Sequence, residues 1–441
     1  MTLSARGLPA TRPVGRHDKE RDMQLDFIRL DDVAAPGGYG PHCSRVGDYL
    51  FVASIDPGLG WGDGSSGRAA VAVEAQTRSC METLKAVLSG AGSSLADVVK
   101  VNVHLADAGD FYEFQLVWKE CFAQDPPART VIVVGDTLPG AGQRLNLDAV
   151  ALRSGGQTRR ETLASAGVPS PGEAEWAPYA VKAGPLVFCS GFPATDFTSG
   201  LAVAKHPAFP NYGNDAEMQA DYILGNLNKV LAEAGTSVAD TLEAQLYEPD
   251  LSTFHDIDRV WAQYMPVPPA RSSMGVVDLL VPGAKMVADL IVLVPDAEHA
   301  KGVSEEGLRW HPTQSRGVNF SPTVTAGPWR FLAGQIATPD FGTYVGAPAG
   351  VPNYFSDIEI QADFILQMLS NQLDANQSDL AHCFHARVYL MHPRRDQAGF
   401  ERVWRRYFPD PDRAPALALV PTTGIMFPGP IIEIDLTAVA S

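Results

Sequence analysis

The chain has 441 residues, a length that exceeds one ordinary hydrophobic core and predicts about two to four domains. Hydrophobic residues make up 45% and charged residues 19%, and no apolar run approaches the roughly 18 to 20 residues that a membrane-spanning helix requires. The formal net charge of -17 opposes contact with phosphate backbones, so we expect no nucleic-acid partner and no membrane partner.

The N-terminal segment, residues 1–22, carries Arg, Gly and Pro but lacks the apolar stretch of a secretory signal. We predict a disordered extension there, with Met23 as an alternative start. The five cysteines are scattered and never form a C-x-x-C pair, which predicts reduced thiols in a cytoplasmic protein. Neither that motif nor H-E-x-x-H occurs, and we expect no metal site.

Strand patterns then recur in the same order along the chain. Apolar, β-rich stretches lie at 48–54, 185–192 and 329–336, and a second set lies at 98–105, 241–248 and 383–390. An amphipathic helix is expected between the two members of each pair. Residues 216–235 are the clearest example, with Gly235 in place to end the helix.

A second helix follows each of the later strands and carries a tryptophan. Proline-rich segments come directly after these helices and are expected to stop them. The last two strands of each part are predicted to form a hairpin around a Gly/Pro loop that reads LPGAG, VPGA or FPGP.

The recurrence has one long period. The tryptophans are 143 residues apart, and a set of glutamines that open the first helices recurs after 143 and 142 residues. These residues are Trp118, Trp261 and Trp404, and Gln76, Gln219 and Gln361. We therefore predict three domains, at 23–155, 163–296 and 306–440, joined by polar, Gly-bearing linkers. The tryptophans are expected to be core residues.

Each domain is predicted to be α+β, with the order ββαβαββ and helices on one face of a mixed sheet. The other face of each sheet must also be buried. A threefold arrangement of the sheets achieves this, so we predict a pseudo-trimer formed by one chain, present as a monomer or a low-order homo-oligomer.

One tetrapeptide, Pro-Pro-Ala-Arg, occurs twice before an apolar run and ends at Arg129 and at Arg271. The third copy reads RAPALALVP and has Leu417 where the arginine is expected. Arginine holds a carboxylate with a planar, permanently charged fork, and the two prolines stiffen the chain before it. The pattern favours a carboxylate-binding role for the two arginines.

These motifs together resemble the Rid family of reactive-intermediate deaminases, which are also called YjgF-like proteins or L-PSP endoribonucleases. The resemblance is carried by AGSSLADVVKVNVHLADAGDFYEFQLVWKECFAQDPPAR in the first copy. The second copy adds APYAVKAGPLVFCSGFPA, AEAGTSVADTLEAQLYEPD and VWAQYMPVPPAR, and the third RFLAGQIA, VWRRYF and FPGPIIEIDLTAVA. The resemblance implies a chorismate-mutase-like fold, sites in clefts between units, and hydrolysis of 2-iminoacids or enamines to 2-oxoacids and ammonia.

The resemblance also implies site residues, copy by copy. The family's carboxylate-binding arginine matches Arg129 and Arg271, and its water-handling glutamate matches Glu433 alone. Asn146 and Val287 stand at the glutamate position in the first two copies.

The family tyrosine matches Tyr179, with His42 and Pro322 in the other copies, and the family's Ser-Gly corner matches Ser190 and Gly191. No copy holds the whole set. The corner reads Ala53-Ser54 in the first copy and Ala333-Gly334 in the third.

An imine is already electrophilic, so the protein need only orient it, supply water and move protons. We expect Glu433 to handle water and protons, Tyr179 and Ser190 to hydrogen-bond the substrate, and the N–H of Gly191 to approach it. The arginines would bind a small carboxylate substrate, and no cofactor is required.

Two other functions stay open. The same scaffold supports other hydrolyses or rearrangements, such as those of ring-opening hydrolases or chorismate-cleaving enzymes. The split of arginine and glutamate between copies also fits a non-catalytic protein that binds a carboxylate metabolite or acts as a scaffold.

Overall fold

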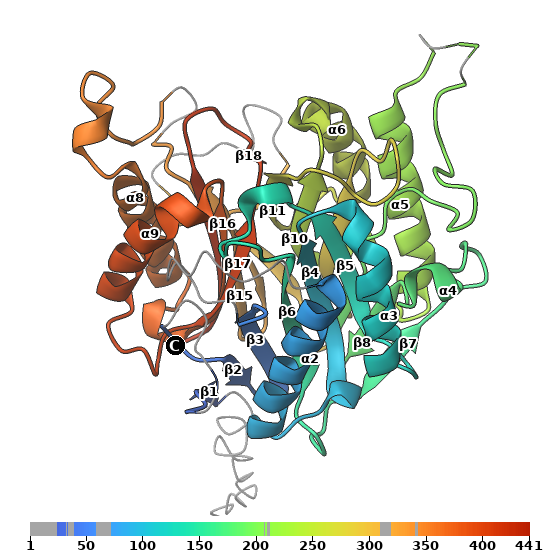
Figure 1. The fold of residues 1–441 in the computed structure, drawn as a ribbon, viewed down its shortest axis with the longest axis horizontal. Helices are drawn as coiled ribbons and strands as arrows, with labels where there is room; N and C mark the ends of the chain where they lie inside the picture. Colours follow the sequence, from blue (N-terminus) through green and yellow to red (C-terminus); the bar gives the residue numbers. More distant parts are fainter. Residues whose placement is uncertain are drawn as a thin grey trace, which may run out of the picture.

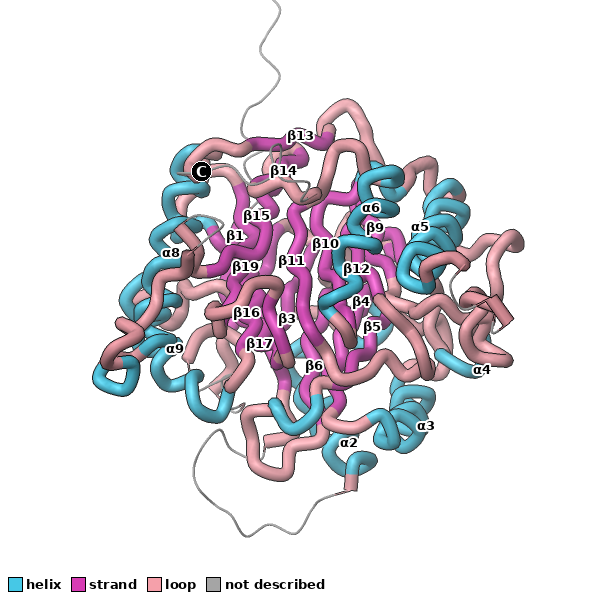
Figure 2. Tube along the Cα trace, turned by 90° about the horizontal axis from the view of Figure 1, so that it is seen from above, coloured by secondary structure: helices cyan, strands magenta, loops and turns pink. Residues whose placement is uncertain are grey.

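The computed structural model describes residues 24–441 apart from residues 32, 34–38, 59–71, 207, 210–211, 309–318 and 340–342. The extension expected at residues 1–22 lies outside the described residues. The chain forms three mixed β-sheets that meet in the middle of the molecule, with the helices around the outside (Figures 1 and 2). We call the sheets with their helices units 1, 2 and 3, in chain order.

Unit 1 has a six-stranded sheet in the order β1-β2-β3-β6-β4-β5. Its elements are β1 (Leu25–Ile28), β2 (Cys43–Val46), β3 (Tyr49–Ile55), α2 (Val73–Gly90), β4 (Val98–Leu105), α3 (Phe111–Cys121), β5 (Ala128–Val133) and β6 (Leu145–Leu152). Short 3-10 helices lie at η2 (Leu95–Asp97), η3 (Ala108–Asp110) and η4 (Gly135–Thr137).

Unit 2 has a seven-stranded sheet in the order β18-β11-β10-β12-β9-β8-β7, in which β18 comes from unit 3. Its own elements are β7 (Arg160–Leu163), α4 (Gly172–Glu175), β8 (Ala180–Ala183), β9 (Leu186–Cys189), α5 (Asp215–Ala232), β10 (Thr241–Glu248), α6 (Phe254–Tyr264), β11 (Ala270–Gly275) and β12 (Val287–Leu293). Its 3-10 helices are η5 (Val238–Asp240) and η6 (Leu251–Thr253).

Unit 3 has a six-stranded sheet in the order β13-β14-β15-β19-β16-β17. Its elements are β13 (Lys301–Ser304), β14 (Thr323–Ala326), β15 (Trp329–Ile336), α8 (Asp357–Ala375), β16 (Cys383–Leu390), α9 (Pro393–Tyr407), β17 (Ala416–Pro421), β18 (Gly424–Ile425) and β19 (Ile432–Val439). Its 3-10 helices are η7 (Pro352–Tyr354) and η8 (Leu380–His382).

The α+β class is confirmed, and each unit also begins with a short edge strand, β1, β7 or β13, that the sequence pattern omitted. The helix expected at 216–235 is α5, which ends at Ala232. The Asn214 side chain caps its first turn, and Gly235 adopts φ 75° in the turn that follows.

The predicted final hairpin is wrong. In unit 1, β5 pairs in parallel with β4, whereas β6 pairs antiparallel with β4 on its other side. The Gly/Pro loop therefore carries the chain across the end of β4 instead of turning back on β5. The reason is that β5 follows α3, and a strand that returns after a crossover helix pairs in parallel with the strand before that helix.

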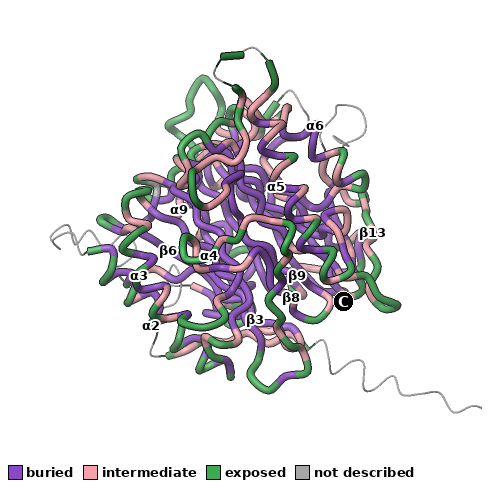
Figure 3. The backbone as a smooth tube through the Cα atoms, turned by 90° about the vertical axis from the view of Figure 1, so that its right-hand side faces the viewer, coloured by how far each residue is buried: buried purple, intermediate pink, exposed green. Residues whose placement is uncertain are grey.

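Each unit has a helix-side core that contains its repeated tryptophan. Trp118 and Trp261 are fully buried and Trp404 is nearly so, which confirms their expected packing role. A fourth apolar cluster lies between the three sheets and includes Phe51, Phe188 and Phe331, one residue from each unit. The buried centre is continuous across the units (Figure 3), so the predicted pseudo-trimer is confirmed as a single packed body.

A buried polar contact also crosses each boundary between units. Lys100 pairs with Asp289 at 2.9 Å, Arg387 pairs with Asp148 at 3.2 Å, and the Ser272 hydroxyl bonds Asp435 at 3.0 Å. The three aspartates hold equivalent places on β6, β12 and β19. Buried charges require partners, so these contacts fix how the units fit together.

The described part of the chain contains no helix that is both long enough and apolar enough to cross a membrane.

Candidate functional site

The candidate residues lie at three junctions, where the strand after the Pro-Ala segment of one unit meets the third strand of the next. Junction 1–2 joins β5 to β9, junction 2–3 joins β11 to β15, and junction 3–1 joins β17 to β3. The junctions are related by the repeat, but their side chains differ.

Junction 2–3 contains Arg271, whose guanidinium is 4.8 Å from the ring centroid of Phe254 and 5.4 Å from that of Trp261. Its Nη1 donates to Asp258 at 2.7 Å, and both side chains are 2% exposed. Asn319 of unit 3 donates to the other oxygen of Asp258 at 2.8 Å. Asp258 is the one hydrogen-bond partner of the Arg271 side chain within the described chain, so Nε and Nη2 keep donor capacity for a ligand.

Glu433 reaches the same junction from β19 of unit 3. Burial and the carboxyl of Asp435 raise its pKa well above the ordinary value, whereas Arg271 and a hydrogen bond with Ser272 oppose that rise. A Cβ at Gly334 would lie 1.9 Å from Oε1 of Glu433 and 2.5 Å from Oγ of Ser272. Glycine is therefore needed there to admit the carboxyl group. The raised pKa favours the protonated form of the Glu433 carboxyl group.

A second acid, Glu248, lies near Arg271 at the end of β10. Its side chain is buried, and neither carboxyl oxygen makes a well-formed hydrogen bond, although Thr253 is near enough to lower its pKa. Burial raises the pKa to about 8, and Arg271 opposes the rise. The equivalent residues Leu105 and Leu390 are apolar core residues, so this acid is particular to unit 2.

Junction 1–2 contains Arg129, whose guanidinium is fully buried and already occupied. Nη1 donates to Gln115 at 2.6 Å, and Nη2 donates to the Glu175 carboxylate at 2.9 Å and to the Glu175 carbonyl. Nε has no partner. The guanidinium also packs against the rings of Phe111, Phe114 and Trp118. Glu175 comes from α4 of unit 2, so one unit supplies the arginine and the next supplies its carboxylate.

The other residues expected at this junction are engaged in holding it together. The Ser190 hydroxyl accepts from the Arg129 N–H at 2.8 Å and donates to the Pro178 carbonyl at 2.5 Å. The Gly191 N–H donates to Thr130 at 2.9 Å, and a Cβ at Gly191 would lie 2.5 Å from Val287. Val287 stands at the position of Glu433, so an apolar side chain replaces the acid here.

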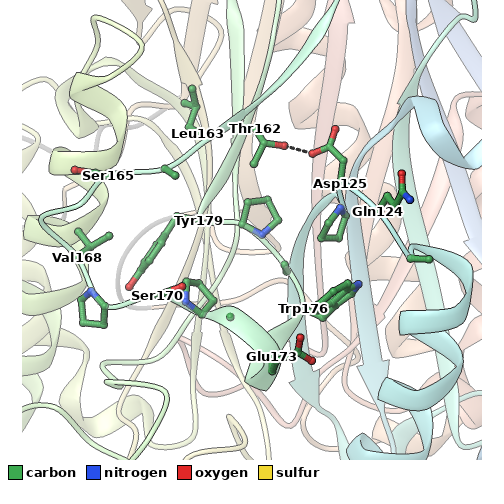
Figure 4. A pocket seen from close by; sticks show the side chains of 18 residues that line it. Gln124, Asp125, Thr162, Leu163, Ser165, Val168, Ser170, Glu173, Trp176 and Tyr179 are labelled. Atoms are coloured by element: carbon green, nitrogen blue, oxygen red, sulfur yellow. Dashed lines mark hydrogen bonds between the residues drawn. The ribbon is translucent and has the colours of Figure 1, made fainter.

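Tyr179 lies in the helix-side core of unit 2. Its ring makes edge-to-face contacts with Phe192 at 5.3 Å and Phe197 at 6.0 Å, and burial raises its pKa. It also lines a surface cavity of about 540 Å³ beside α4 (Figure 4). Tyr179, Ser190, Gly191 and Arg129 thus share junction 1–2.

Junction 3–1 has neither an arginine nor a carboxylate at the compared positions. Leu417 and Tyr39 both pack against the helix-side core of unit 3, and the Tyr39 hydroxyl donates to the Phe408 carbonyl. Asn146 bonds His104 at 2.7 Å and donates to the Leu419 carbonyl at 3.2 Å. The hydrogen bonds of Tyr39 and Asn146 are thus between uncharged groups.

The predicted site residues are therefore divided between two junctions. Four lie at junction 1–2, and two, Arg271 and Glu433, meet at junction 2–3. The family resemblance implied sites in clefts between units, and Arg271 of unit 2 lies near Glu433 of unit 3. Their roles in binding and catalysis remain predictions.

Sequence reasoning missed Asp258, Glu248 and Glu175. Asp258 has a detectable signal, because the position three residues before the repeated tryptophan is polar in every copy, as Gln115, Asp258 and Glu401. Glu248 stands out when the copies are compared, since the others have leucine. Glu175 lies in a segment with no counterpart motif, and only the fold reveals its partner.

Within the described ranges, no group of three or more His, Cys, Asp or Glu side chains is arranged to hold a metal ion. The chemistry of the junctions rests on arginine, carboxyl and hydroxyl groups.

The fold and its junctions define a class of protein in which three α+β units, fused in one chain, present arginine and carboxyl groups at the boundaries between units. The family model described as Endoribonuclease L-PSP matches residues 35–152, 169–294 and 314–440. The chain belongs to this family, also known as the Rid or YjgF-like family, as three tandem copies.

Single-copy relatives match parts of the chain. A RutC family protein of Pyrococcus abyssi (strain GE5 / Orsay) is 39% identical over 118 residues, which are 25% of this chain and 86% of the relative. Protein DfrA of Myxococcus xanthus is 39% identical over 142 residues, which are 30% of this chain and 98% of the relative.

Solved structures of the family also match single portions. The yeast protein YEO7 is 26% identical, with a TM-score of 0.26, and the match covers 30% of this chain and 99% of that one. The YjgF gene product of E. coli is 24% identical, with a TM-score of 0.25, and the match covers 29% of this chain and 98% of that one.

Proposed function

We propose that this protein hydrolyses a small, carboxylate-bearing imine or enamine to the corresponding oxoacid and ammonia, and that junction 2–3 is the active one. The observation that carries the proposal is the meeting of Arg271 and Glu433 from different units. Together they supply one fixed positive charge and one group that transfers a proton.

Arg271 is suited to bind the substrate carboxylate. Asp258 holds one end of the guanidinium, and the aromatic rings on either side limit its rotation. The remaining donors form a planar fork that matches a carboxylate. A substrate bound there would have its imine carbon, which is bonded directly to the carboxylate carbon, close to the boundary with unit 3.

Glu433 would act as the acid and then as the base. In its protonated form it donates to the imine nitrogen, and the resulting carboxylate takes a proton from the water whose oxygen adds to the carbon. The carbinolamine then receives that proton on nitrogen, the C–N bond breaks, and ammonia leaves. The hydroxyl proton returns to Glu433, so one water is consumed and the acid is regenerated.

The other two junctions lack parts of this set. Junction 1–2 has Val287 in place of the acid, and its arginine is already paired with Glu175. Junction 3–1 has Leu417 and Asn146. One working junction per chain is the simplest expectation.

A relative supports the chemical class. TdcF of Escherichia coli (strain K12), described as a candidate reactive intermediate deaminase, is 30% identical over 130 residues, which are 28% of this chain and 96% of the relative. The side chain of the substrate and the pathway that forms it are open to direct measurement.

The test is hydrolysis of 2-iminoacids generated in situ by an amino-acid oxidase, with ammonia release as the readout. Arg271→Met and Glu433→Gln are expected to lower kcat/KM by about a hundredfold or more. Arg129→Met is the matched control, because it removes the equivalent arginine from junction 1–2, and it is expected to retain activity when folded. Equal rates in wild type and in both junction 2–3 variants would contradict the proposal.

A binding function without turnover is the second candidate, and the absence of the arginine–acid pair from junctions 1–2 and 3–1 favours it. The two functions are separated by measuring thermal stabilisation by 2-oxoacids alongside turnover. Stabilisation that depends on Arg271, with no ammonia release from any imine tested, would identify a carboxylate-binding protein.

A further inference from the structure

The contact between Arg129 and Glu175 has the form of a ligand contact. The guanidinium is fully buried and receives the Glu175 carboxylate at 2.9 Å on Nη2. The carboxylate belongs to the neighbouring unit and not to unit 1, just as the carboxylate of a bound ligand would not belong to unit 1. Gln115 holds the other end of the guanidinium, as Asp258 does for Arg271.

The segment that carries Glu175 is short and conformationally restrained. Helix α4 has four residues, and its first residue, Gly172, and the residue after it, Trp176, have positive φ, at 44° and 49°. A left-handed tryptophan is costly. Two hydrogen bonds anchor Trp176 to unit 1. Nε1 of Trp176 donates to the Phe122 carbonyl at 2.7 Å, and Nε1 of Trp118 donates to the Trp176 carbonyl at 2.9 Å. These anchors fix the carboxylate at the arginine.

Two further observations indicate a binding slot. Nε of Arg129 is buried without a partner, so the guanidinium has more donor capacity than Glu175 and Gln115 use. The cavity of about 540 Å³ is lined by Glu173 and Trp176, which lie two residues before and one residue after Glu175 (Figure 4). The cavity therefore lies next to the short helix that carries Glu175.

We propose that Arg129 forms a second small-carboxylate site and that Glu175 is its intrachain occupant, which keeps junction 1–2 closed. The inference concerns a junction outside the proposed active one and does not depend on turnover. The ligand class is a small aliphatic monocarboxylate. Truncation of glutamate to alanine removes a CH₂ and a carboxylate, so acetate is the matched probe.

The test compares the melting temperature of Glu175→Ala in sodium acetate and in sodium chloride at equal ionic strength. The variant is expected to melt lower than wild type, because a buried guanidinium loses its anion. Acetate is expected to restore several degrees with a saturable dose response, and the bulkier pivalate is not. Wild type gives the baseline, because its slot is filled and any acetate shift that it shows comes from other sites, such as Arg271.

Three controls make the result specific. Glu173→Ala removes a mostly exposed acid that pairs with Lys119, and it is expected to show neither loss nor rescue. Glu175→Gln keeps the slot filled and is expected to lose stability without rescue by acetate. Arg129→Met combined with Glu175→Ala removes the anion's partner and is expected to shift with acetate no more than wild type does.

The inference is overturned if acetate does not raise the melting temperature of Glu175→Ala. It is also overturned if acetate raises the melting temperature of the double variant Arg129→Met/Glu175→Ala by the same amount. If Glu175→Ala does not accumulate as folded protein, its refolding yield in acetate and in chloride replaces the melting temperature. Equal yields in the two salts would overturn it as well.

Discussion

Lys100 of unit 1 and Asp289 of unit 2 form an ion pair of 2.9 Å across a unit boundary, with side chains that are only 3% and 4% exposed. The ammonium group also donates to Thr130 at 2.8 Å and to the Cys189 carbonyl. Burial lowers the lysine pKa, and Asp289 opposes that shift. The pair therefore depends on both members being present.

We expect Lys100→Met to lower the free energy of unfolding by about 3–5 kcal/mol, because Asp289 is left buried without its cation. Combining it with Asp289→Leu is expected to recover part of that loss. Chemical denaturation of the three variants checks this. Arg78→Met is the surface control, since its pairs with Glu74 and Glu120 are exposed and are worth less than about 1 kcal/mol. A Lys100→Met loss no larger than that of the control would contradict the expectation.

The pH dependence of turnover tests the role of Glu433. Its pKa is raised, so the protonated form that donates to the imine persists to higher pH, and kcat is expected to fall as pH rises through that pKa. The Asp435 carboxyl contributes to the rise. Asp435→Asn is therefore expected to move the basic limb of the kcat profile to lower pH while retaining Arg271-dependent substrate binding.

A profile of Asp435→Asn that superimposes on wild type would show that Glu433 is not the group that titrates. Glu433→Gln is the companion measurement. It is expected to remove the basic limb together with most of kcat, while KM changes little, since the carboxylate of the substrate is held by Arg271.

Glu248 links stability to pH. Its folded-state pKa of about 8 lies above the unfolded value of about 4.3, so between these values the folded state binds the extra proton. Stability from this group is thus greatest below the unfolded value and is lost as pH rises toward and through 8. Glu248→Leu, the residue type of the other two copies, is expected to flatten that decline and to raise the melting temperature more at pH 8.5 than at pH 5.

The exposed Glu161 provides the control for this measurement. Glu161→Leu is expected to leave the pH dependence of melting unchanged. If Glu248→Leu lowers the melting temperature equally at both pH values, the carboxyl group makes a contact whose stabilising free energy exceeds the cost of burying it.

Periodicity and repetition predicted the three α+β units and their closure, because those features depend on the spacing of apolar residues such as Trp118 and its counterparts. The final hairpin was mispredicted, because a turn between two strands looks the same in sequence whether or not the strands pair. The structure shows that β5 does not pair with β6, because β5 pairs in parallel with β4, to which α3 connects it.

The sequence predicted those residues of the candidate site that belong to recognisable motifs. Arg271 was found by comparing the copies and Glu433 from the family resemblance, but the contact of Arg129 was not foreseen, because Glu175 lies in an irregular segment with no repeat. The role of Ser190 was also hidden, since its hydroxyl bonds two backbone groups that no motif marks.

Leu417 poses the last question, whether junction 3–1 has lost only its arginine. In that unit Glu401, the counterpart of Asp258, bonds Gln397 at 2.8 Å and lies 3.6 Å from Arg405. A guanidinium introduced by Leu417→Arg would therefore find an acid nearby and is expected to be tolerated. No turnover is expected from it, because Asn146 is neutral and is held by His104 and the Leu419 carbonyl.

The measurement is ammonia release by Leu417→Arg placed in an Arg271→Met background, where activity from junction 2–3 is removed. We expect no increase over Arg271→Met alone, and a melting temperature close to that of the background shows that the variant is folded. Addition of Asn146→Glu supplies the missing acid and tests whether the pair suffices. Turnover regained by Leu417→Arg alone would mean that junction 3–1 is a decayed copy of an active site, whereas unchanged turnover supports specialisation of the three units.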